Sequence, residues 1–543
     1  MDEPWYKNAV FYAVDVALFQ DSNGDGIGDF KGLTSRVPYL ADLGVTCVWI
    51  LPSYPSLGRD NGYDVTDYYQ IRPQLGTLDD FLEFLHKAGE HGIRVILDLV
   101  VDHTSDKHPW FEAARRDEQS RYRDYYIWSH DPPPPPPGQG TIFPGQESSV
   151  WSYDDVARAF YYHRFYSFEP GLNVANPDVQ DEICRIIDYW LSFGISGFRV
   201  DAALHMVEPK LLDSTEAEDP HGILRRFHDF ATSRRPNALL LGEVDENPDI
   251  LEATFGSGNQ LDMLFNFYLN NDIFLALARE DSGPVIKALQ VLPEPPKTAQ
   301  WANFLRNLDE LDLERLSDEE RDEVFKVFAP EDGMRIFGRG IRRRLAPMLN
   351  GDQRRIELAF SLLFSLPGAP LFVYGDEIGM GEDLAREGRD AVRTAMQWSD
   401  QANAGFSTAA ADKLTAPVID RGDFAYRQVN VANQLESPDS LLSKVRSFIR
   451  LRREHHAIGS AAFRLEDTAE SSILGHSYKS GKASLILLHN LRGAERKAQI
   501  DIVQAEGGRL RDLLSGEEQR LERRTQTVRM EPYGYRWLLA TPD

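Results

Sequence analysis

Short apolar runs alternate with amphipathic stretches over the first two thirds of the chain. The runs are rich in Val, Ile, Leu and aromatic side chains, as buried strands are, and apolar residues recur at helical spacing between them. Eight runs qualify as strands, at residues 10–18, 46–51, 94–99, 197–200, 239–242, 261–265, 303–306 and 370–374. Eight strand–helix repeats predict an α/β protein with a parallel sheet, either closed as a (β/α)8 TIM barrel or open as a doubly wound sheet.

The gap between the third and fourth strand candidates is much longer than one crossover helix needs. It covers residues 104–176 and contains six consecutive prolines, Pro132 to Pro137. Such a run cannot be helical and adopts a stiff polyproline conformation. It is either a recognition motif for a partner or a stiff surface segment, and we favour a surface segment of an inserted domain.

After Trp398 the pattern changes. Residues 440–456 predict a helix, and short alternating stretches at 472–478, 483–488 and 535–540 predict an antiparallel β-sandwich. At 543 residues the chain is too long for one compact core. We expect a barrel domain in two parts, 1–103 and 177–454, with an inserted domain at 104–176 and a C-terminal β-sandwich at 455–543.

Three strand candidates lead into acidic residues. Asp201 and Glu243 each follow a buried run directly, and Asp309 follows the run at 303–306. One such carboxylate could be a solvated helix cap. Three of them suggest an active site, because the C-terminal ends of barrel strands meet on one face.

Four stretches carry a resemblance to a known family. They are 98–103 (Asp-Leu-Val-Val-Asp-His), 197–202 (Gly-Phe-Arg-Val-Asp-Ala), 242–244 (Gly-Glu-Val) and 307–309 (Asn-Leu-Asp). The chain resembles the α-amylase superfamily, glycoside hydrolase family 13. Within it the chain is most similar to the trehalose synthases, which convert maltose to trehalose, through residues 21–30, 62–65, 338–347 and 392–398 among others. The resemblance favours the barrel over the doubly wound sheet and makes 104–176 the family's domain B.

The resemblance also implies residue roles. Asp201 is then the nucleophile, Glu243 the general acid/base and Asp309 the third acid, which holds sugar hydroxyls. His103 then binds the reacting sugar, Tyr63 is the aromatic platform beneath it, and Asp64 with Arg393 grips the non-reducing end, as in exo-acting relatives. A general acid that stays protonated near neutral pH implies some apolar shielding of Glu243.

Arg199 lies two residues before Asp201 on the same strand. Side chains alternate along a strand, so the two point to the same side. A cation there keeps a nucleophilic carboxylate ionised. A structural ion pair is the alternative reading, and the two are not exclusive.

The segment 21–29 (Asp-Ser-Asn-Gly-Asp-Gly-Ile-Gly-Asp) places oxygen ligands at alternate positions with glycines between them. This pattern suits a hard cation, and we expect structural Ca²⁺. The candidate ligands are Asp21, Asn23, Asp25, Asp29 and the carbonyl of Ile27. The alternative is an Asx-rich turn without an ion.

Two positions depart from the family pattern. Leu308 stands where the family has a His that donates a hydrogen bond to the reacting sugar, and Asp102 stands where it has Asn. The first change predicts slower turnover, and the second adds negative charge near the cleft or near a second cation site. Neither change touches the acid pair.

Composition limits the partners. A net charge of −26 argues against nucleic acid and anionic membranes, which are polyanions. Cys47 and Cys184 both lie in apolar segments and predict buried free thiols. No signal peptide and no apolar run of ~18 residues is visible, so we expect a cytoplasmic protein.

Three functions remain open. The first is rearrangement of maltose to trehalose by a retaining enzyme. The second is hydrolysis or transglucosylation of short α-glucosides through the same intermediate. The third, of another class, is a weakly catalytic sugar-binding paralogue, which Leu308 and Asp102 would permit.

Overall fold

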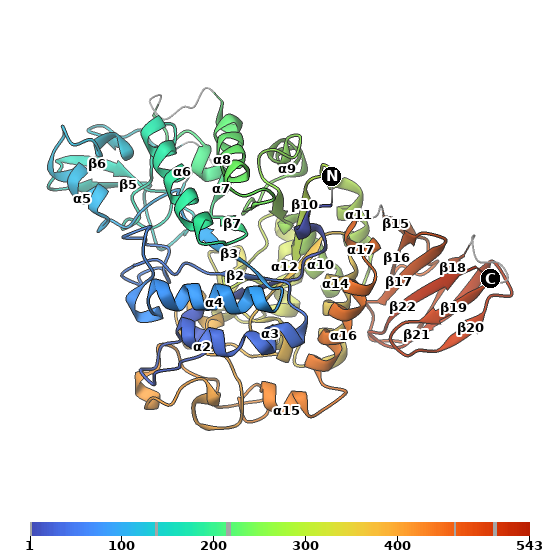
Figure 1. Ribbon diagram of the computed structural model, residues 1–543. Coiled ribbons are helices and arrows are strands. Elements are labelled where there is room, and N and C mark those ends of the chain that lie inside the picture. Colours follow the sequence, from blue (N-terminus) through green and yellow to red (C-terminus); the bar gives the residue numbers. More distant parts are fainter. Residues whose placement is uncertain (1–2, 136–139, 213–218, 461–462, 503–507, 543) are drawn as a thin grey trace.

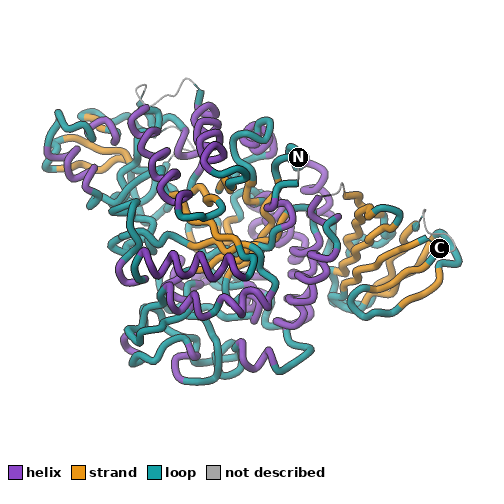
Figure 2. The backbone as a smooth tube through the Cα atoms, viewed as in Figure 1, coloured by secondary structure: helices purple, strands orange, loops and turns teal. Residues whose placement is uncertain are grey.

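The computed structural model describes residues 3–135, 140–212, 219–460, 463–502 and 508–542. Eight parallel strands close a barrel in the order β1-β14-β10-β9-β8-β7-β3-β2. They lie at the centre of the molecule, enclosed by helices (Figure 2). Their bounds are β1 (Phe11–Val14), β2 (Cys47–Ile50), β3 (Arg94–Leu99), β7 (Gly197–Val200), β8 (Leu239–Gly242), β9 (Met263–Phe265), β10 (Gln300–Phe304) and β14 (Ala369–Val373). The predicted barrel is confirmed, and all eight predicted runs contribute a strand.

The barrel strands are buried on both faces, as parallel strands covered by helices are. One predicted strand is too long. The apolar run at 10–18 ends as a strand at Val14, and the carboxylate of Asp15 then accepts the N–H of Ala17 at 2.9 Å. This N-cap starts the short helix α1 (Val16–Phe19), so apolar content alone did not distinguish strand from helix here.

Helices surround the barrel and follow its strands (Figure 1). Their bounds are α2 (Phe30–Ser35), α3 (Val37–Leu43), α4 (Leu78–Glu90), α6 (Pro177–Ser192), α7 (Ala203–Val207), α8 (Pro220–Arg234), α9 (Pro248–Phe255), α10 (Phe267–Arg279), α11 (Gly283–Val291), α12 (Asp318–Phe328), α13 (Leu345–Met348), α14 (Gln353–Ser365), α15 (Val431–Leu435), α16 (Leu441–Glu454) and α17 (Ala457–Ser460). The predicted helix at 440–456 is α16, and Ser440 caps it by accepting the N–H of Ser443.

A small antiparallel sheet is inserted between β3 and α6, as expected. It consists of β4 (Trp128–Ser129), β6 (Ala159–Tyr162) and β5 (Trp151–Asp154), and the helix α5 (Pro109–Arg116) precedes it. The sheet projects from one side of the barrel (Figure 1). In the proline run, the carbonyl of Pro133 accepts the indole N–H of Trp151 at 3.1 Å, whereas Pro136 and Pro137 lie outside the described residues.

A second short sheet follows β10. Its strands are β11 (Leu311–Asp312), β12 (Arg335–Ile336) and β13 (Gly340–Ile341). The loop between β12 and β13 reaches the inserted segment, where the Arg339 guanidinium donates to the carbonyl of Ile142 at 3.2 Å. Phe337 and Phe143 also meet there, with ring centroids 5.1 Å apart.

The C-terminal region is an antiparallel β-sandwich. One sheet has the order β15-β16-β17-β22-β19-β20 and the other pairs β18 with β21. Apolar residues from both sheets, such as Ile486, Ile500 and Met530, share one core. The bounds are β15 (Phe463–Glu466), β16 (Ile473–Ser480), β17 (Ala483–Asn490), β18 (Arg496–Asp501), β19 (Arg509–Asp512), β20 (Glu518–Arg520), β21 (Thr525–Met530) and β22 (Tyr535–Thr541).

Two further observations concern the cysteines and the helix lengths. Cys47 and Cys184 are buried free thiols, as predicted. Among the described residues, no helix combines the length and apolar character needed to cross a membrane.

Candidate active site

Arg199 organises the charged groups at the C-terminal ends of three neighbouring strands. In the barrel register Asp98 of β3 lies beside Arg199 of β7, and Arg199 lies beside Leu241 of β8. The Arg199 guanidinium donates from Nη1 to Asp98 and to Asp201, the latter at 2.5 Å. Its Nη2 lies 2.7 Å from Oε2 of Glu243. The two carboxylates predicted as a catalytic pair therefore share one guanidinium.

The backbone after Asp201 turns in a left-handed conformation. Ala202 has φ 46° and ψ 44°, a region that a residue with a Cβ enters at a cost of about 1–3 kcal/mol. The turn starts α7 and directs the N–H of Ala202 to the Glu243 carboxylate at 3.3 Å. The strained residue lies directly after Asp201, at the turn where β7 ends beside β8.

The protonation of the site is set by burial and by Arg199. Burial raises the pKa of Asp201 to about 7, against the attraction of Arg199. The pKa of Asp98 is raised by burial to about 6 with the same opposition. Glu243 is the most accessible of these acids, with 26% of its side chain exposed, and it faces Arg199. The expected apolar shielding of Glu243 stays a prediction.

Asp309 lies between two arginines. Nη2 of Arg393 donates to Oδ1 of Asp309 at 2.8 Å, and Nη1 of Arg389 lies 3.3 Å from the same oxygen. Burial opposes ionisation of Asp309, but the two arginines outweigh it and lower its pKa. Arg389 also binds Glu310 through two nitrogens, at 2.6 and 3.1 Å.

Asp64 and Arg393 were expected to act as a pair, and the structure does not bring them together. Asp64 is fully buried and binds Ser56 and Arg59, with Nε of Arg59 at 3.3 Å. The acids whose charges act on Arg393 are Asp309 and, after it, Asp60, which stands four residues before Asp64 in the same loop. Burial raises the pKa of Asp60, and Arg393 and Arg389 oppose the rise.

His103 lies between two buried carboxylates. Its Nδ1 is 3.7 Å from Asp102 and its Nε2 is 3.8 Å from Oε1 of Glu169. Burial alone would lower the pKa of His103, but Glu169 and Asp102 outweigh it and raise the pKa to about 9. The Tyr63 ring lies near Arg199, with the guanidinium carbon 5.8 Å from the ring centroid.

The extra negative charge of Asp102 is neutralised inside the protein. Nζ of Lys210 donates to Asp102, and both side chains are buried. Burial disfavours the carboxylate, but Lys210 and His103 outweigh it and lower the pKa of Asp102. Leu308, the second departure, is 4% exposed and belongs to the main hydrophobic core.

The predicted cation loop folds around Asp21. This carboxylate accepts the N–H groups of Asn23 and Gly24 at Oδ1 and that of Gly26 at Oδ2, at 2.7–2.9 Å. The side chains of Asn23 and Asp25 accept the N–H groups of Asp25 and Ile27, each at 2.8 Å. Asp29 caps α2 by accepting the N–H of Gly32 at 2.7 Å.

A different acidic cluster has metal-ligand spacing. Asp245, Asp312 and Glu314 each offer an oxygen within 4.8 Å of the others. Arg315 and Arg339 contact it, at 3.0 Å from Asp245 and 2.7 Å from Asp312. The spacing of these oxygens is suitable for a metal ion, and Asp245 stands two residues after Glu243 in the sequence.

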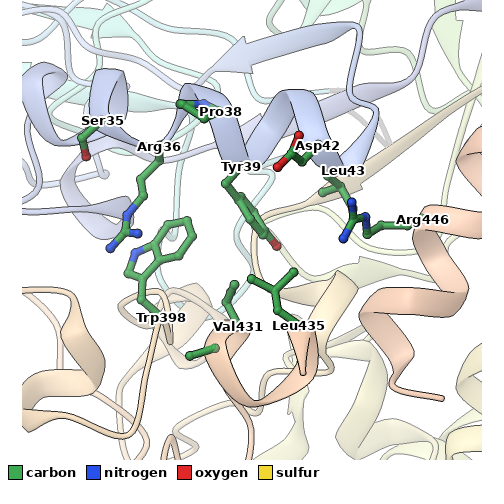
Figure 3. Close-up of a pocket in the computed structure, with 11 residues that line it drawn as sticks. Ser35, Arg36, Pro38, Tyr39, Asp42, Leu43, Trp398, Val431, Leu435 and Arg446 are labelled. Atoms are coloured by element: carbon green, nitrogen blue, oxygen red, sulfur yellow. The ribbon is translucent and has the colours of Figure 1, made fainter. Parts of the chain in front are cut away.

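A pocket of about 350 Å³ lies away from these acids, between α3, α15 and α16. Figure 3 shows Arg36 and Tyr39 directed toward Trp398, with the Arg36 guanidinium 4.0 Å from the indole centroid. None of the predicted site residues lines this pocket.

Four charged residues of the site were not singled out from the sequence: Asp60, Asp98, Glu169 and Arg389. Asp98 had a signal, because it ends a buried strand on the side of the barrel that also presents Arg199. Asp60 and Arg389 stand four residues before Asp64 and Arg393 in irregular loops, where no period selects one acid or arginine over another. Glu169 lies in the inserted segment without any local pattern.

A closed parallel barrel that gathers acids and arginines at the C-terminal ends of its strands has the architecture of a barrel enzyme, and its paired carboxylates fit glycoside hydrolysis. Residues 16–461 match the family model described as "Alpha amylase, catalytic domain". The chain belongs to the α-amylase family, glycoside hydrolase family 13.

Two relatives are similar over most of the chain. "Trehalose synthase/amylase TreS" of Mycolicibacterium smegmatis is 43% identical over 479 residues, which cover 88% of this chain and 80% of the relative. "Trehalose synthase" of Pimelobacter sp. (strain R48) is 40% identical over 531 residues, covering 95% and 92%. Among solved structures, an alpha-amylase from H. orenii superposes with a TM-score of 0.79 at 27% identity, covering 98% of this chain and 99% of that one.

Proposed function

We propose that this enzyme rearranges maltose to trehalose by a retaining mechanism with a covalent glucosyl-enzyme. The observation that carries the proposal is the shared contact of Asp201 and Glu243 with Arg199. It supports a pair close enough for one group to attack while the other protonates, as retaining enzymes need. The two relatives named for trehalose synthesis favour maltose as the substrate.

In the first step the Asp201 carboxylate attacks C1 of the non-reducing glucosyl unit. The bond from C1 to O4 of the second glucose breaks, and Glu243 donates a proton to O4. In the second step the released glucose turns, Glu243 takes the proton from its anomeric hydroxyl, and that oxygen attacks C1. The bond to Asp201 breaks, and the α configuration is restored.

Asp309, Arg393, Asp60 and Tyr63 bind the glucosyl unit in this proposal. Asp309 is held ionised by Arg389 and Arg393, so it accepts hydrogen bonds from sugar hydroxyls. Asp60 takes the place that Asp64 was expected to fill at the non-reducing end. Asp64 itself is occupied by Ser56 and Arg59 and stabilises the loop.

Retention of the released glucose requires a closed site. The inserted segment and the loop between β12 and β13 meet through Phe143 and Phe337, and Arg389 stacks on Phe143 with its guanidinium carbon 4.8 Å from the ring centroid. Closure of this kind excludes water from the intermediate. When it opens, water takes the place of the glucose and the same enzyme hydrolyses its substrate.

Hydrolysis or transfer to another acceptor is therefore the second candidate. The name of the M. smegmatis relative joins "amylase" to trehalose synthase, which favours a mixed activity. Activity on starch offered alone would indicate an open cleft, whereas activity on short α-glucosides but not on starch would indicate a closed pocket.

We also propose Ca²⁺ as a structural ion of the loop at 21–29. Asp21, Asn23, Asp25, Asp29 and the Ile27 carbonyl would hold it, since hard oxygens suit this ion. The spacing of oxygen-bearing side chains supports the assignment, and in the folded loop the oxygens of Asp21, Asn23 and Asp25 accept backbone N–H groups, as they would in an Asx-rich turn. The ion would stabilise the loop after β1 and take no part in bond cleavage.

The test is incubation of the purified protein with maltose, followed by chromatography of the products. Trehalose as the main product supports the proposal. Glucose alone supports the second candidate, and no turnover of maltose or of an aryl α-glucoside would leave sugar binding as the remaining function.

A further inference from the structure

Glu169 is a buried carboxylate that the proposed mechanism leaves without a task. It lies in the inserted segment and is fully buried, yet among the described residues its Oε1 has no hydrogen-bond partner. Its other oxygen accepts the N–H of Tyr166 at 3.3 Å. A buried acceptor without a partner is costly, so such an atom points to a bound group.

The free oxygen faces the histidine that is expected to bind the sugar. Oε1 of Glu169 lies 3.8 Å from Nε2 of His103, which is too far for a hydrogen bond. A hydroxyl oxygen placed beside this gap reaches both atoms at ordinary hydrogen-bond length. The spacing therefore fits a hydroxyl that the two side chains hold together.

Backbone contacts link the two segments that carry His103 and Glu169. The N–H of Thr104 donates to the carbonyl of Pro170 at 3.2 Å, and His103 pairs with Gly171 in an isolated β-bridge. The residues next to His103 are thus bonded to the residues next to Glu169. These contacts join the inserted segment to the loop after β3 beside the gap.

The pair offers a hydroxyl one donor and one acceptor. Nε2 of His103 lies 3.3 Å from the carbonyl oxygen of Tyr63, which only accepts, so this nitrogen carries a proton. The Nε2–H donates and the Glu169 carboxylate accepts. A hydroxyl accepts one hydrogen bond and donates one, so it pairs with both groups while the Tyr63 carbonyl shares the Nε2–H.

We propose that Glu169 is a substrate-binding residue, which together with His103 holds one hydroxyl of the glucosyl unit and selects for sugars that carry it. The proposal rests on the proposed function only in placing a glucosyl unit in this site. It assigns to the inserted segment a direct contact with the sugar and a part in specificity.

The experiment combines enzyme variants with monodeoxy sugars. Glu169→Leu removes the acceptor, Glu169→Gln keeps an amide oxygen in its place, and Glu118→Gln, at an exposed position of the same segment, is the matched control. Each is assayed for kcat/KM on 4-nitrophenyl α-glucoside and on its 2-, 3-, 4- and 6-deoxy forms. Binding of glucose and of its deoxy forms is measured by calorimetry, independently of turnover.

We expect Glu169→Leu to lower kcat/KM on the parent glucoside by about tenfold or more. On one deoxy analogue, the one that lacks the bound hydroxyl, the same variant should match the wild type. Glu169→Gln should lie between the two, and Glu118→Gln should change nothing. The glucose affinities should follow the same pattern.

Equal losses on every analogue would overturn the inference and leave Glu169 a structural residue that holds buried water. A folded Glu169→Leu protein with unchanged activity and affinity would overturn it too. Failure of the proposed function gives a separate result, which is a wild type that binds glucose but turns over no α-glucoside. In that case the affinities alone decide the inference. A wild type that binds neither glucose nor any deoxy form overturns both.

Discussion

Nη2 of Arg199 lies 2.7 Å from Oε2 of Glu243 and joins the end of β7 to the end of β8. The same guanidinium binds Asp201 through Nη1 at 2.5 Å. One cation thus faces both members of the proposed catalytic pair. Its loss should change the ionisation of the pair as well as its geometry.

Arg199→Met should raise the pKa of Asp201 further above about 7, because burial then acts without its main opposing charge. Asp201 must be ionised to attack, so the acid limb of kcat/KM should move to higher pH. At pH 7 we expect a loss of about tenfold or more. The measurement is the pH profile of kcat/KM, with Arg199→Lys as the charge-preserving control. A variant that stays active with an unshifted acid limb would contradict this role.

From the sequence alone, Leu308→His would restore the family's hydrogen bond to the sugar and is expected to give a faster enzyme. The burial of Leu308 in the main core changes the expected result. An imidazole there loses apolar contacts and buries a polar group, so we expect a loss of about 1–3 kcal/mol in the free energy of unfolding. Leu308→Met, which keeps the volume, should cost less. The measurements are the denaturant midpoint and kcat/KM of each variant. A Leu308→His enzyme with unchanged stability and tenfold higher kcat/KM would contradict the expected destabilisation and support the hydrogen bond to the sugar.

Chelation tests the calcium loop. Removal of Ca²⁺ should lower the melting temperature, because binding to the folded state alone stabilises it, while activity at low temperature changes little. Asp25→Asn, which alters an exposed proposed ligand, should reduce the response to chelator. A protein that contains no metal by elemental analysis and melts unchanged in chelator rules the ion out.

His476 and His489 predict acid sensitivity at the contact between barrel and sandwich. Their rings stack 5.7 Å apart, and His489 hydrogen-bonds Ser361 of α14 at 2.9 Å. Burial lowers the pKa of His476 to about 4 and that of His489 well below its ordinary value. The unfolded chain, with pKa values near ~6.5, therefore binds protons that the folded chain excludes.

The stability from this pair is present above pH ~6.5 and declines as the pH falls toward about 4. Unfolding free energies measured across that interval should show a shallower slope for His476→Gln than for the wild type. Exposed His86→Gln is the control. Equal slopes for His476→Gln and the wild type would show that the neutral form of His476 does not contribute to the acid sensitivity.

The barrel could be predicted because its information is local and repeated. Each buried strand is a short apolar run, and each run is separated from the next by a helical pattern. The error at Asp15 arose where an apolar run crossed a polar cap without a change of hydrophobicity. A helix cap depends on a single hydrogen bond between one side chain and one backbone N–H, and the apolar content of a segment does not reveal such a bond.

From pattern alone, the site could be predicted best where residues lie in a strand or follow one. Asp201 and Glu243 are fixed by the ends of β7 and β8, so their meeting at Arg199 follows from barrel register. Asp60, Arg389 and Glu169 lie in loops and in the inserted segment, whose paths depend on distant contacts such as that between Phe143 and Phe337. The choice of Asp64 over Asp60 shows the limit, since both stand in one loop and only three-dimensional placement separates them.

The most direct test of the central claim is conversion of unlabelled maltose in the presence of excess ¹³C-glucose. The proposed enzyme keeps the released glucose in its closed site and returns it to the glucosyl-enzyme. It therefore predicts trehalose as the main product, with almost no label in early turnover. Trehalose that carries ¹³C in proportion to the free glucose would contradict intramolecular transfer, and glucose without trehalose would contradict the synthase altogether.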